Sequence, residues 1–422
     1  MTIFRTLIVG IAVVPMLTAC DLTEKNNITT IHQGYSETAP QYEVNGRIIS
    51  NIDVRARSWN ARGKSAELKV IRALFLTHAY NIALTDAEQA RATLARQKYA
   101  DAIVINSLMA SGVGIVAVDE AVYEKGLKRN QNAGMTVAST TLYGFKGDGE
   151  MPLLERIERS KSVVDKLGMA LVENTQTIRQ AKKDNNMAVI FNSQGADYVI
   201  DDLTMVKTVK DRGLQISNFT YNNNSALAGG GTLQDMGVTE LGREFIKHAN
   251  NNKLILDCSH SSNQTCIDTA KYSQKPILAT HSNPSAVYDI SRNMSDAAIK
   301  AVASTGGNVC SAGLGLFLNS EGNASPEDYA KHVDYTANLI GRDRTCYATD
   351  YLHNAYDYAV IYINSPDVYP PEKGYGVPVQ NLAAEHIWAV VAVLEDKYQW
   401  SDTDVRGFLG ENLMRVYQAN WE

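Results

Sequence analysis

The feature that most constrains this chain is a pair of short apolar segments, each of which leads into a histidine. Leu254–Cys258 is followed within two residues by His260, and Ile277–Ala279 is followed within two residues by His281. A helix-length segment separates the two runs. Apolar runs this short, with a helix between them, are typical of a β-α-β unit with buried parallel strands. Because neighbouring parallel strands open at their carboxyl ends onto the same space, the pattern predicts that the two imidazoles share one site.

The same alternation continues along the chain from residue 100 onward. Short apolar or β-branched runs predict strands at Ala102–Leu108, Met135–Thr140, Met187–Phe191, Leu214–Thr220, Leu254–Cys258, Pro276–Ala279, Gly307–Ala312 and Thr345–Asp350. Most gaps have helical spacing, at Leu153–Gly168, Asp201–Arg212, Thr239–Asn250, Cys266–Ser273, Ser295–Ser304 and Ser325–Ile340. Eight strands alternating with helices favour an α/β fold of the (β/α)8 TIM-barrel type. An open doubly wound sheet is the alternative.

The first residues of the chain are predicted to lie outside this fold. Residues 1–19 combine Arg5, an apolar run and a small-residue ending, which is typical of a secretory signal peptide. The sequence Leu-Thr-Ala before Cys20 resembles the lipobox of bacterial lipoproteins, in which the cysteine is acylated. An ordinary cleaved signal with a chance cysteine is the alternative. We therefore expect an exported protein of the bacterial periplasm that a lipid on Cys20 anchors to a membrane.

The remaining chain is predicted to form a tether and one domain. Residues 20–42 are polar and suit a tether between lipid and domain. A single domain over 43–422 would begin with a short hairpin around Asn45-Gly46 and with helices inside 65–99, and would end with two closing helices, Asn381–Tyr398 and Thr403–Ala419. Two long loops, 221–236 and 351–377, follow predicted strands, where such loops usually form lids or substrate walls.

Composition excludes one class of partner and leaves cysteine chemistry open. The chain has 422 residues, a net charge of −6 and no basic stripe, so we expect no nucleic acid partner. Export permits disulfides. Because Cys258, Cys310 and Cys346 all lie in apolar runs, buried thiols are favoured, and a bridge between Cys258 and Cys266 is the less favoured alternative.

His260 and His281 are the strongest candidates for chemistry. Imidazole is the commonest metal ligand, and two imidazoles on adjacent strands can share an ion or act in acid–base catalysis. Two hydrogen-bonded polar residues at strand ends would be the purely structural explanation. Their place at the same point of consecutive strands favours a functional role.

Other candidate residues follow the neighbouring strands. Asp350 ends the last strand, where a carboxylate could accept a proton from an attacking water or simply cap a loop. Arg292 could grip a substrate carboxylate, or could be a surface arginine paired with Asp289 or Asp296. Tyr221 could bind substrate through its hydroxyl, or pack in the core or a lid. Gln194 is a poor metal ligand whose default role is hydrogen bonding. Of the other histidines, only His353 lies close enough to the last strand to reach the site.

Together these segments resemble the membrane (renal) dipeptidase family of the amidohydrolase superfamily. The segments LILDCSHSS, PILATHS and SRNMSD carry the resemblance, and DVRGFLGENLMRVYQAN is similar to the closing helix of the family. The similarity covers roughly Ala100–Asn420. It implies a metallopeptidase with a (β/α)8 barrel and a dinuclear zinc site that cleaves dipeptides. Members of this family often form dimers, so a homodimer is a further expectation.

The resemblance also assigns roles position by position. His260 and His281 match the two strand-end zinc ligands of the family. Arg292 matches the arginine that binds the substrate carboxylate, and Asp350 matches the aspartate that handles the catalytic water.

The chain departs from the family at the remaining ligands. The family's first strand carries Asp-Gly-His-Asn-Asp, of which His-x-Asp binds one zinc ion. This chain has Asn106-Ser107-Leu108-Met109-Ala110 there, so both ligands are missing. The glutamate that bridges the two zinc ions is Gln194 here, and the histidine that polarises the substrate is Tyr221. The standard dinuclear site therefore cannot form. His260 and His281 could hold one ion, with Gln194, Asp350 or water completing the coordination, so we expect one zinc ion or none.

Three functions are compatible with these residues. The favoured one is a single-metal hydrolase that cleaves a dipeptide or dipeptide-like amide. The second is a metal-free enzyme that uses His260, Tyr221 and Asp350 for proton transfer on a peptide-derived compound such as a siderophore. The third is a ligand-binding barrel without turnover, since function depends on the site and not on the fold.

Overall fold

The computed structural model describes most of the chain from residue 82 onward. The described residues are 82, 84–115, 118–149, 151–322, 324–352, 365, 367–370, 373, 375 and 380–422, with the backbone of 29–30, 41–44 and 47–50. The predicted signal peptide, Cys20, the helix expected before residue 80 and His353 lie outside the described residues. In the described part, no helix has the length and apolar character needed to cross a bilayer.

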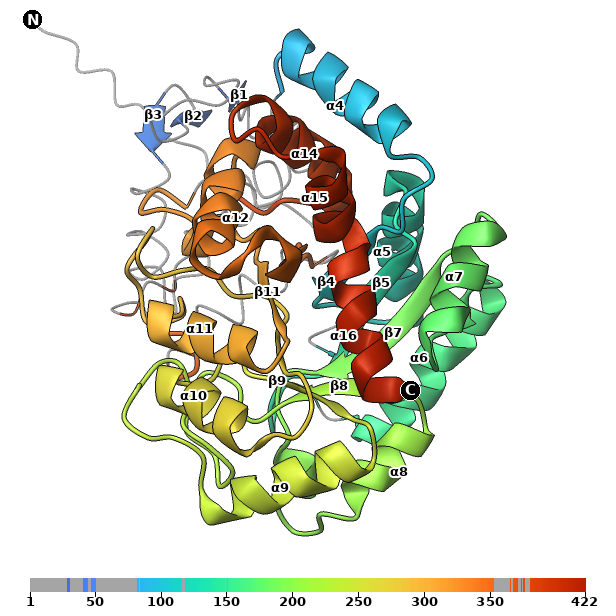
Figure 1. The fold of residues 1–422 in the computed structure, drawn as a ribbon, viewed down its shortest axis with the longest axis vertical. Coiled ribbons are helices and arrows are strands. Elements are labelled where there is room, and N and C mark those ends of the chain that lie inside the picture. Colours follow the sequence, from blue (N-terminus) through green and yellow to red (C-terminus); the bar gives the residue numbers. More distant parts are fainter. Residues whose placement is uncertain are drawn as a thin grey trace, which may run out of the picture.

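Parallel strands form the centre of the fold (Figure 1). In chain order they are β4 (Ile105–Met109), β5 (Val137–Tyr143), β7 (Ala188–Ser193), β8 (Leu214–Asn218), β9 (Ile255–Asp257), β10 (Leu278–Ala279), β11 (Asn308–Ser311) and β12 (Thr345–Tyr347), with each hydrogen-bonded to the next. A two-residue strand that the sequence did not predict, β6 (Ala170–Leu171), pairs with β7. Beyond β12, Tyr351 bridges to Met109 and the backbone N–H of Asp350 donates to the Leu108 carbonyl, which brings the last strand back to the first. This arrangement confirms the predicted (β/α)8 barrel.

Helices cover the outside of the barrel (Figure 1). They are α4 (Asp86–Lys98), α5 (Glu120–Ala133), α6 (Leu153–Lys166), α7 (Thr175–Lys183), α8 (Met205–Asp211), α9 (Glu240–Asn251), α10 (Asn263–Tyr272), α11 (Asp296–Ser304), α12 (Pro326–Ile340), α14 (Ile387–Asp396), α15 (Asp402–Arg406) and α16 (Asn412–Trp421). Short 3-10 turns lie at Asp197–Val199, Gly315–Phe317, Arg342–Arg344 and Ala384–His386, and a π-helical turn at Gly407–Glu411 joins α15 to α16. The hydroxyls of Thr239, Ser262 and Ser295 cap α9, α10 and α11 by accepting a backbone N–H. These caps start the helices promptly after the loops that carry the candidate site residues.

Apolar side chains from alternate strand positions fill the barrel. Ile190, Ile216, Ile255 and Leu278 are fully buried there, and Leu413 of α16 belongs to the same cluster. The helix α16 therefore closes one end of the barrel, and the strand-end loops with the candidate residues surround the other.

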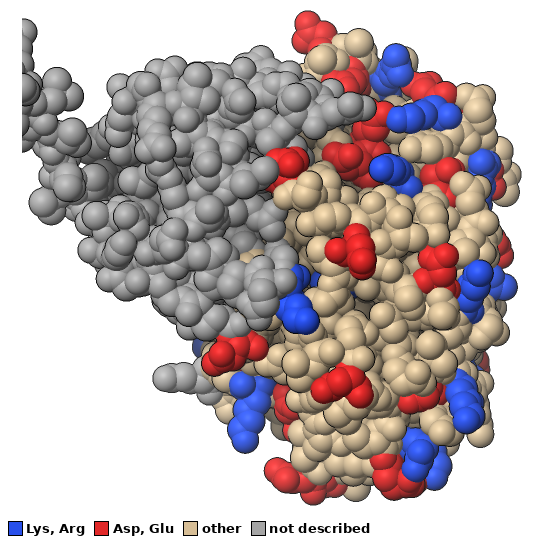
Figure 2. Space-filling model, turned by 90° about the vertical axis from the view of Figure 1, so that its left-hand side faces the viewer, with Lys and Arg blue, Asp and Glu red and all other residues tan. Residues whose placement is uncertain are grey.

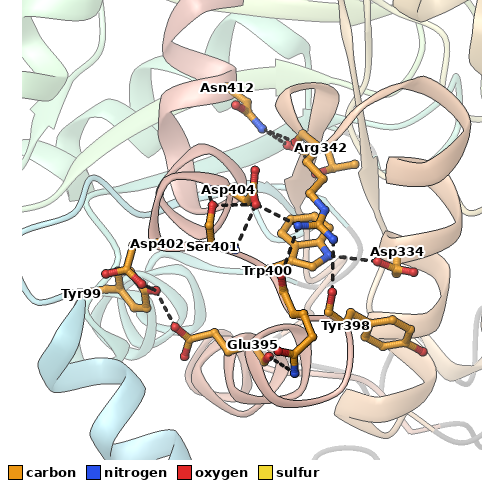
Figure 3. A network of polar contacts seen from close by, with 12 residues as sticks. Tyr99, Asp334, Arg342, Glu395, Tyr398, Trp400, Ser401, Asp402, Asp404 and Asn412 are labelled. Atoms are coloured by element: carbon orange, nitrogen blue, oxygen red, sulfur yellow. Dashed lines mark hydrogen bonds and ion pairs between the residues drawn. The ribbon is translucent and has the colours of Figure 1, made fainter.

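The C-terminal helices are tied to the barrel by a polar network (Figure 3). Trp400 donates its indole N–H to Asp334 at 2.9 Å, and Arg342 forms an ion pair with Asp404 at 2.9 Å. The hydroxyl of Tyr99 donates to Glu395 at 2.6 Å, which ties α4 to α14. On the coloured part of the face drawn in Figure 2, acidic and basic side chains are interspersed, and neither sign dominates there.

The short hairpin expected around Asn45-Gly46 is confirmed as a strand pair. β2 (Gln41–Val44) pairs antiparallel with β3 (Arg47–Ser50), so that Val44 lies opposite Arg47, and β1 (Thr29–Thr30) pairs with β2.

The prediction of buried free thiols is wrong. All four cysteines of the barrel are buried, but Cys258 is bonded to Cys266 and Cys310 to Cys346. The register of the sheet explains the second pair, because Cys310 of β11 lies directly opposite Cys346 of β12. The first pair joins the end of β9 to the first turn of α10, and brings two Cα atoms within 5.3 Å.

Candidate active site

His260 lies in a tight turn directly after β9. Its backbone has a positive φ of 66°, and its carbonyl accepts the N–H of Gly231 at 2.6 Å. The neighbouring Gly230 bridges to Ser261, and a Cβ on Gly230 would lie 2.1 Å from the carbonyl oxygen of Asn222. The three-glycine sequence thus allows its loop to pack against the histidine turn, which leaves the imidazole only 5% exposed.

His281 lies at the end of the adjacent strand β10 and is completely buried. Its ring centroid lies 4.8 Å from that of His260. Its Nδ1 lies 2.8 Å from the hydroxyl oxygen of Thr280, and that hydroxyl donates to the carboxylate of Asp257. Since the only hydroxyl proton of Thr280 is used in this way, Nδ1 of His281 must be the donor, and the proton of the neutral ring sits on Nδ1. The structure thus brings the two predicted histidines together.

The inner nitrogens of both rings are buried and unpartnered. Within the described residues, neither Nε2 of His260 nor Nε2 of His281 has a hydrogen-bond partner. Burial, followed by the nearby Arg292 guanidinium, holds the pKa of each imidazole well below its usual value. Both rings are therefore neutral, and an unpartnered lone pair in such a place suits a cation or a ligand that donates a hydrogen bond.

Arg292 is buried beside the histidines, which rules out the surface role considered from the sequence. It is 4% exposed and donates to the Ser282 hydroxyl at 3.1 Å and to the His281 carbonyl at 2.9 Å. Its guanidinium lies 5.2 Å from the centroid of the Phe317 ring, and its buried Nε has no partner in the described part of the chain. Among the described residues it has no carboxylate partner within ion-pair distance, so an anionic ligand would supply the missing charge.

Asp350 lies on the extension of β12, which is separated from the His281 strand β10 by β11. Its φ is 53°, its N–H donates to the Leu108 carbonyl, and its own carbonyl accepts from Asn381 at 2.9 Å. Burial raises the pKa of this carboxyl to about 6, against the opposing charge of Arg292. Asp350 is therefore ionised at neutral pH but protonated at mildly acidic pH.

Gln194 and Tyr221 differ in how they relate to the histidines. The Gln194 side chain is buried and donates its amide to the Thr141 hydroxyl at 2.8 Å. The ring of Tyr221 stacks on His260 with 4.1 Å between centroids, and its hydroxyl accepts from Tyr369 at 3.1 Å. Tyr221 thus lies in the site itself, whereas the Gln194 amide is held by the neighbouring strand β5.

The residues present do not fit a two-ion centre. Leu108 and Ala110, which occupy the positions of the two missing first-strand ligands, are buried and apolar and belong to the cluster inside the barrel. No group of three or more His, Cys, Asp or Glu side chains suited to a metal occurs in the described part of the chain. The two orphaned Nε2 atoms do fit a single ion that takes its remaining ligands from water or substrate.

Three aromatic residues and one amide of the site were missed from the sequence. Phe317 is buried against the Arg292 guanidinium, Tyr369 is buried against Tyr221, and Tyr375 is buried against both Phe317 and Tyr369. Asn222 hydrogen bonds to His260. The only signals were the triple-asparagine run after Tyr221 and the tyrosine-rich loop after Asp350, and neither has a spacing that specifies a contact.

Several solved structures share this fold. An amidohydrolase from Pseudomonas aeruginosa superposes with a TM-score of 0.66 at 23% identity, over 78% of this chain and 99% of that one. The probable dipeptidase PvdM from the same organism gives 0.61 at 16% identity, over 79% and 99%. A metallo peptidase from Rhodobacter sphaeroides, bound to a phosphinate mimic of the dipeptide L-Ala-D-Ala, gives 0.58 at 17% identity, over 76% and 100%. At these identities the likeness establishes the fold alone.

Sequence relatives and a family model match parts of the chain. An uncharacterized protein in the PQQ-III 3' region of Acinetobacter calcoaceticus is 27% identical over 178 residues, 40% of this chain and 56% of that protein. One in the pqqA 5' region of Klebsiella pneumoniae is 31% identical over 119 residues, 27% and 44% of the two proteins. The chain thus spans about half the length of the curated relatives it matches. Residues 151–359 match the family model described as Membrane dipeptidase (Peptidase family M19). Over residues 151–359, just under half of its length, the chain is thus similar to the membrane dipeptidase family.

Proposed function

We propose that this protein is a dipeptidase-like hydrolase that cleaves a dipeptide or dipeptide-like amide with a single metal ion, which we expect to be zinc. The observation that carries the proposal is the convergence of two neutral imidazoles and a buried guanidinium. Among the described residues, neither Nε2 atom has a hydrogen-bond partner and the guanidinium has no carboxylate partner. The two Nε2 atoms suit a cation, and the Arg292 guanidinium suits the carboxylate of a small peptide. The family and the dipeptidase fold neighbours support the same class of reaction.

Each side chain has a defined task in this proposal. Arg292 binds the terminal carboxylate of the substrate, and its buried setting excludes the water that would compete for it. Asp350 is ionised at neutral pH and accepts a proton from the attacking water at its carboxylate. Tyr221 offers its hydroxyl to the amide carbonyl of the substrate. An ion held by Nε2 of His260 and His281 would lower the pKa of that water when bound.

Two buried disulfides support the proposed location. Disulfides persist in oxidising compartments such as the bacterial periplasm. We accordingly propose that the protein is exported and held to a membrane by a lipid on Cys20.

The test is a hydrolysis screen with the exported domain in the presence of zinc. Dipeptides with L,L and L,D stereochemistry are offered, and free amino acids are measured by mass spectrometry. We expect release from at least one class of dipeptide, and loss of that release in His281→Ala. If no dipeptide is cleaved although dipeptides bind in an Arg292-dependent way, the hydrolase assignment is wrong.

A second candidate function is favoured by the apolar residues at Leu108 and Ala110 and by the engaged amide of Gln194. These leave few ligands for an ion and suit metal-free proton transfer by His260, Tyr221 and Asp350 on a peptide-derived compound. If metal-depleted protein converts such a compound to product, this second function is the correct one. Binding without turnover would instead select a ligand-binding barrel.

The shifted pKa of Asp350 predicts how activity depends on pH. Because burial raises its pKa from 3.8 to about 6, the carboxylate is protonated below that value and cannot accept a proton. We expect kcat/KM to rise with pH through about 6 and then level off, and Asp350→Asn to abolish activity. If a partly active Asp350 variant still loses kcat/KM below the same pH, the loss is caused by the protonation of another group.

The ionised form of Asp350 is also disfavoured in the folded state. Asp350→Asn should therefore raise the free energy of unfolding at pH 7 and leave it unchanged below pH 4.

A further inference from the structure

Asn222 is a buried residue of the site to which neither the sequence nor the family match gives a role. It follows Tyr221, is completely buried, and has a positive φ of 58°. Its backbone carbonyl accepts two hydrogen bonds from Thr232, from the N–H at 2.9 Å and from the hydroxyl at 2.7 Å. The residue is therefore held in one orientation by its backbone, before its side chain makes any contact.

The side chain of Asn222 connects His260 to the segment that contains Val368. Its Nδ2 donates to the carbonyl oxygen of Val368 at 2.9 Å. Its Oδ1 lies 2.7 Å from Nδ1 of His260, and it also accepts the hydroxyl of Tyr375 at 3.0 Å. The opposite orientation of the amide would set Oδ1 against the Val368 carbonyl and leave two acceptors facing each other, so the orientation is fixed by chemistry.

This orientation determines where the proton of His260 lies. Since Oδ1 of Asn222 can only accept, Nδ1 of His260 must donate, and in a neutral ring Nε2 is then left bare. The same amide hydrogen bonds to residue 368, next to Tyr369. Tyr369 in turn donates to the hydroxyl of Tyr221, whose ring stacks on His260. One side chain thus sets the tautomer of the histidine and holds the segment that contacts Tyr221.

We propose that Asn222 is a positioning residue of this site, which fixes His260 as the Nδ1–H tautomer with Nε2 directed at the ligand. This inference rests on the proposed function, because a bare Nε2 is what a metal ion or a hydrogen-bond donor of the substrate requires. Asn222 itself does not contact the reacting atoms, and acts through His260.

Substitutions at 222 separate the two contacts of the amide. Asn222→Gly tolerates the positive φ and removes both the acceptor for His260 and the donor to Val368. Asn222→Asp keeps an acceptor for His260 but removes the donor to Val368. The neighbouring Asn223 provides the matched control, because its Nδ2 donates to the carbonyl of Asp367 at 2.9 Å in the same segment and no contact joins it to His260. Asn223→Asp therefore makes the same chemical change without touching the histidine.

The experiment reads the tautomer of His260 directly by NMR. The exported domain is labelled with ¹⁵N in histidine, freed of metal, and measured at about pH 8, where an ordinary histidine is neutral. The spectrum of His260→Gln assigns the signals. We expect His260 to be the Nδ1–H tautomer in the wild type, in Asn222→Asp and in Asn223→Asp, and to lose that preference in Asn222→Gly. An Nε2–H tautomer in the wild type, or an unchanged Nδ1–H tautomer in a folded Asn222→Gly protein, overturns the proposal.

Zinc affinity gives a second measurement on the same variants. Loss of the hydrogen-bond partner of a metal-binding histidine typically lowers metal affinity by about 10- to 100-fold. We expect a loss of zinc affinity of this size in Asn222→Gly, a smaller change in Asn222→Asp and no change in Asn223→Asp. If Asn222→Gly fails to fold, the tautomers of His260 in the wild type and in Asn222→Asp still test whether Nδ1 carries the proton. The spectra need no turnover, so a correct tautomer with no dipeptide hydrolysis would contradict the proposed reaction and leave the role of Asn222 standing.

Discussion

Replacing Cys310 and Cys346 together by alanine is expected to lower the free energy of unfolding by about 4 kcal/mol, the chain-entropy value for a loop of this length. The disulfide closes a 36-residue loop and joins neighbouring strands of the barrel, where both side chains are fully buried. Urea denaturation of the oxidised domain, followed by circular dichroism, measures the difference.

The second disulfide is the matched control. Cys258 and Cys266 are only 8 residues apart. The same model therefore predicts that their double alanine variant loses only about 2.5 kcal/mol. An unfolding free energy that is unchanged in the Cys310 and Cys346 variant would contradict the pairing of β11 with β12 through sulfur. Equal losses in both variants would contradict the dependence on loop length.

Arg292→Ala is expected to weaken the binding of a dipeptide by about 1.5–3 kcal/mol, the range for a hydrogen bond to a charged group. This corresponds to a loss of roughly 10- to 150-fold in affinity. The expectation follows from the buried guanidinium, whose Nε has no partner among the described residues. Isothermal titration calorimetry with a slowly cleaved dipeptide measures it.

A change in the ligand supplies the control for Arg292. The same dipeptide with its terminal carboxylate converted to an amide should bind the wild type weakly, and Arg292→Ala should then make little further difference. If both ligands lose the same amount of affinity on substitution, Arg292 does not recognise the carboxylate and its contribution is structural.

The barrel and the meeting of the two histidines were predictable because both depend on local pattern. Each histidine follows a short buried run by two residues, and in a parallel sheet such positions must lie on one face. Asp350 was located for the same reason, since it follows β12. The role of Arg292 came from the family resemblance, because this residue lies well beyond the end of β10 and its pattern alone suits a surface arginine. The helices α5 and α7 were missed. Polar residues and Gly126 weaken the apolar spacing of α5, and α7 is only nine residues long.

The cysteine pairing was missed because it depends on register and not on composition. The strand runs Gly307–Ala312 and Thr345–Asp350 were predicted as neighbours in sequence, but nothing in either run fixes which residue lies opposite Cys310. The contacts of Asn222 could not be predicted from the sequence for a related reason. They join residues 146 and 153 positions apart, in a loop whose path the sequence does not specify.

The measurement that tests the central claim most directly is the zinc content of the exported domain, purified without chelator after zinc has been offered. The residues of the site predict one tightly bound ion per chain, lost in His260→Ala and in His281→Ala, because only these two side chains present unpartnered buried nitrogens of the kind that bind zinc in the described site. Two bound ions would show that ligands other than those identified complete the family's centre. No bound ion, or an ion that survives both substitutions, would contradict the single-metal account.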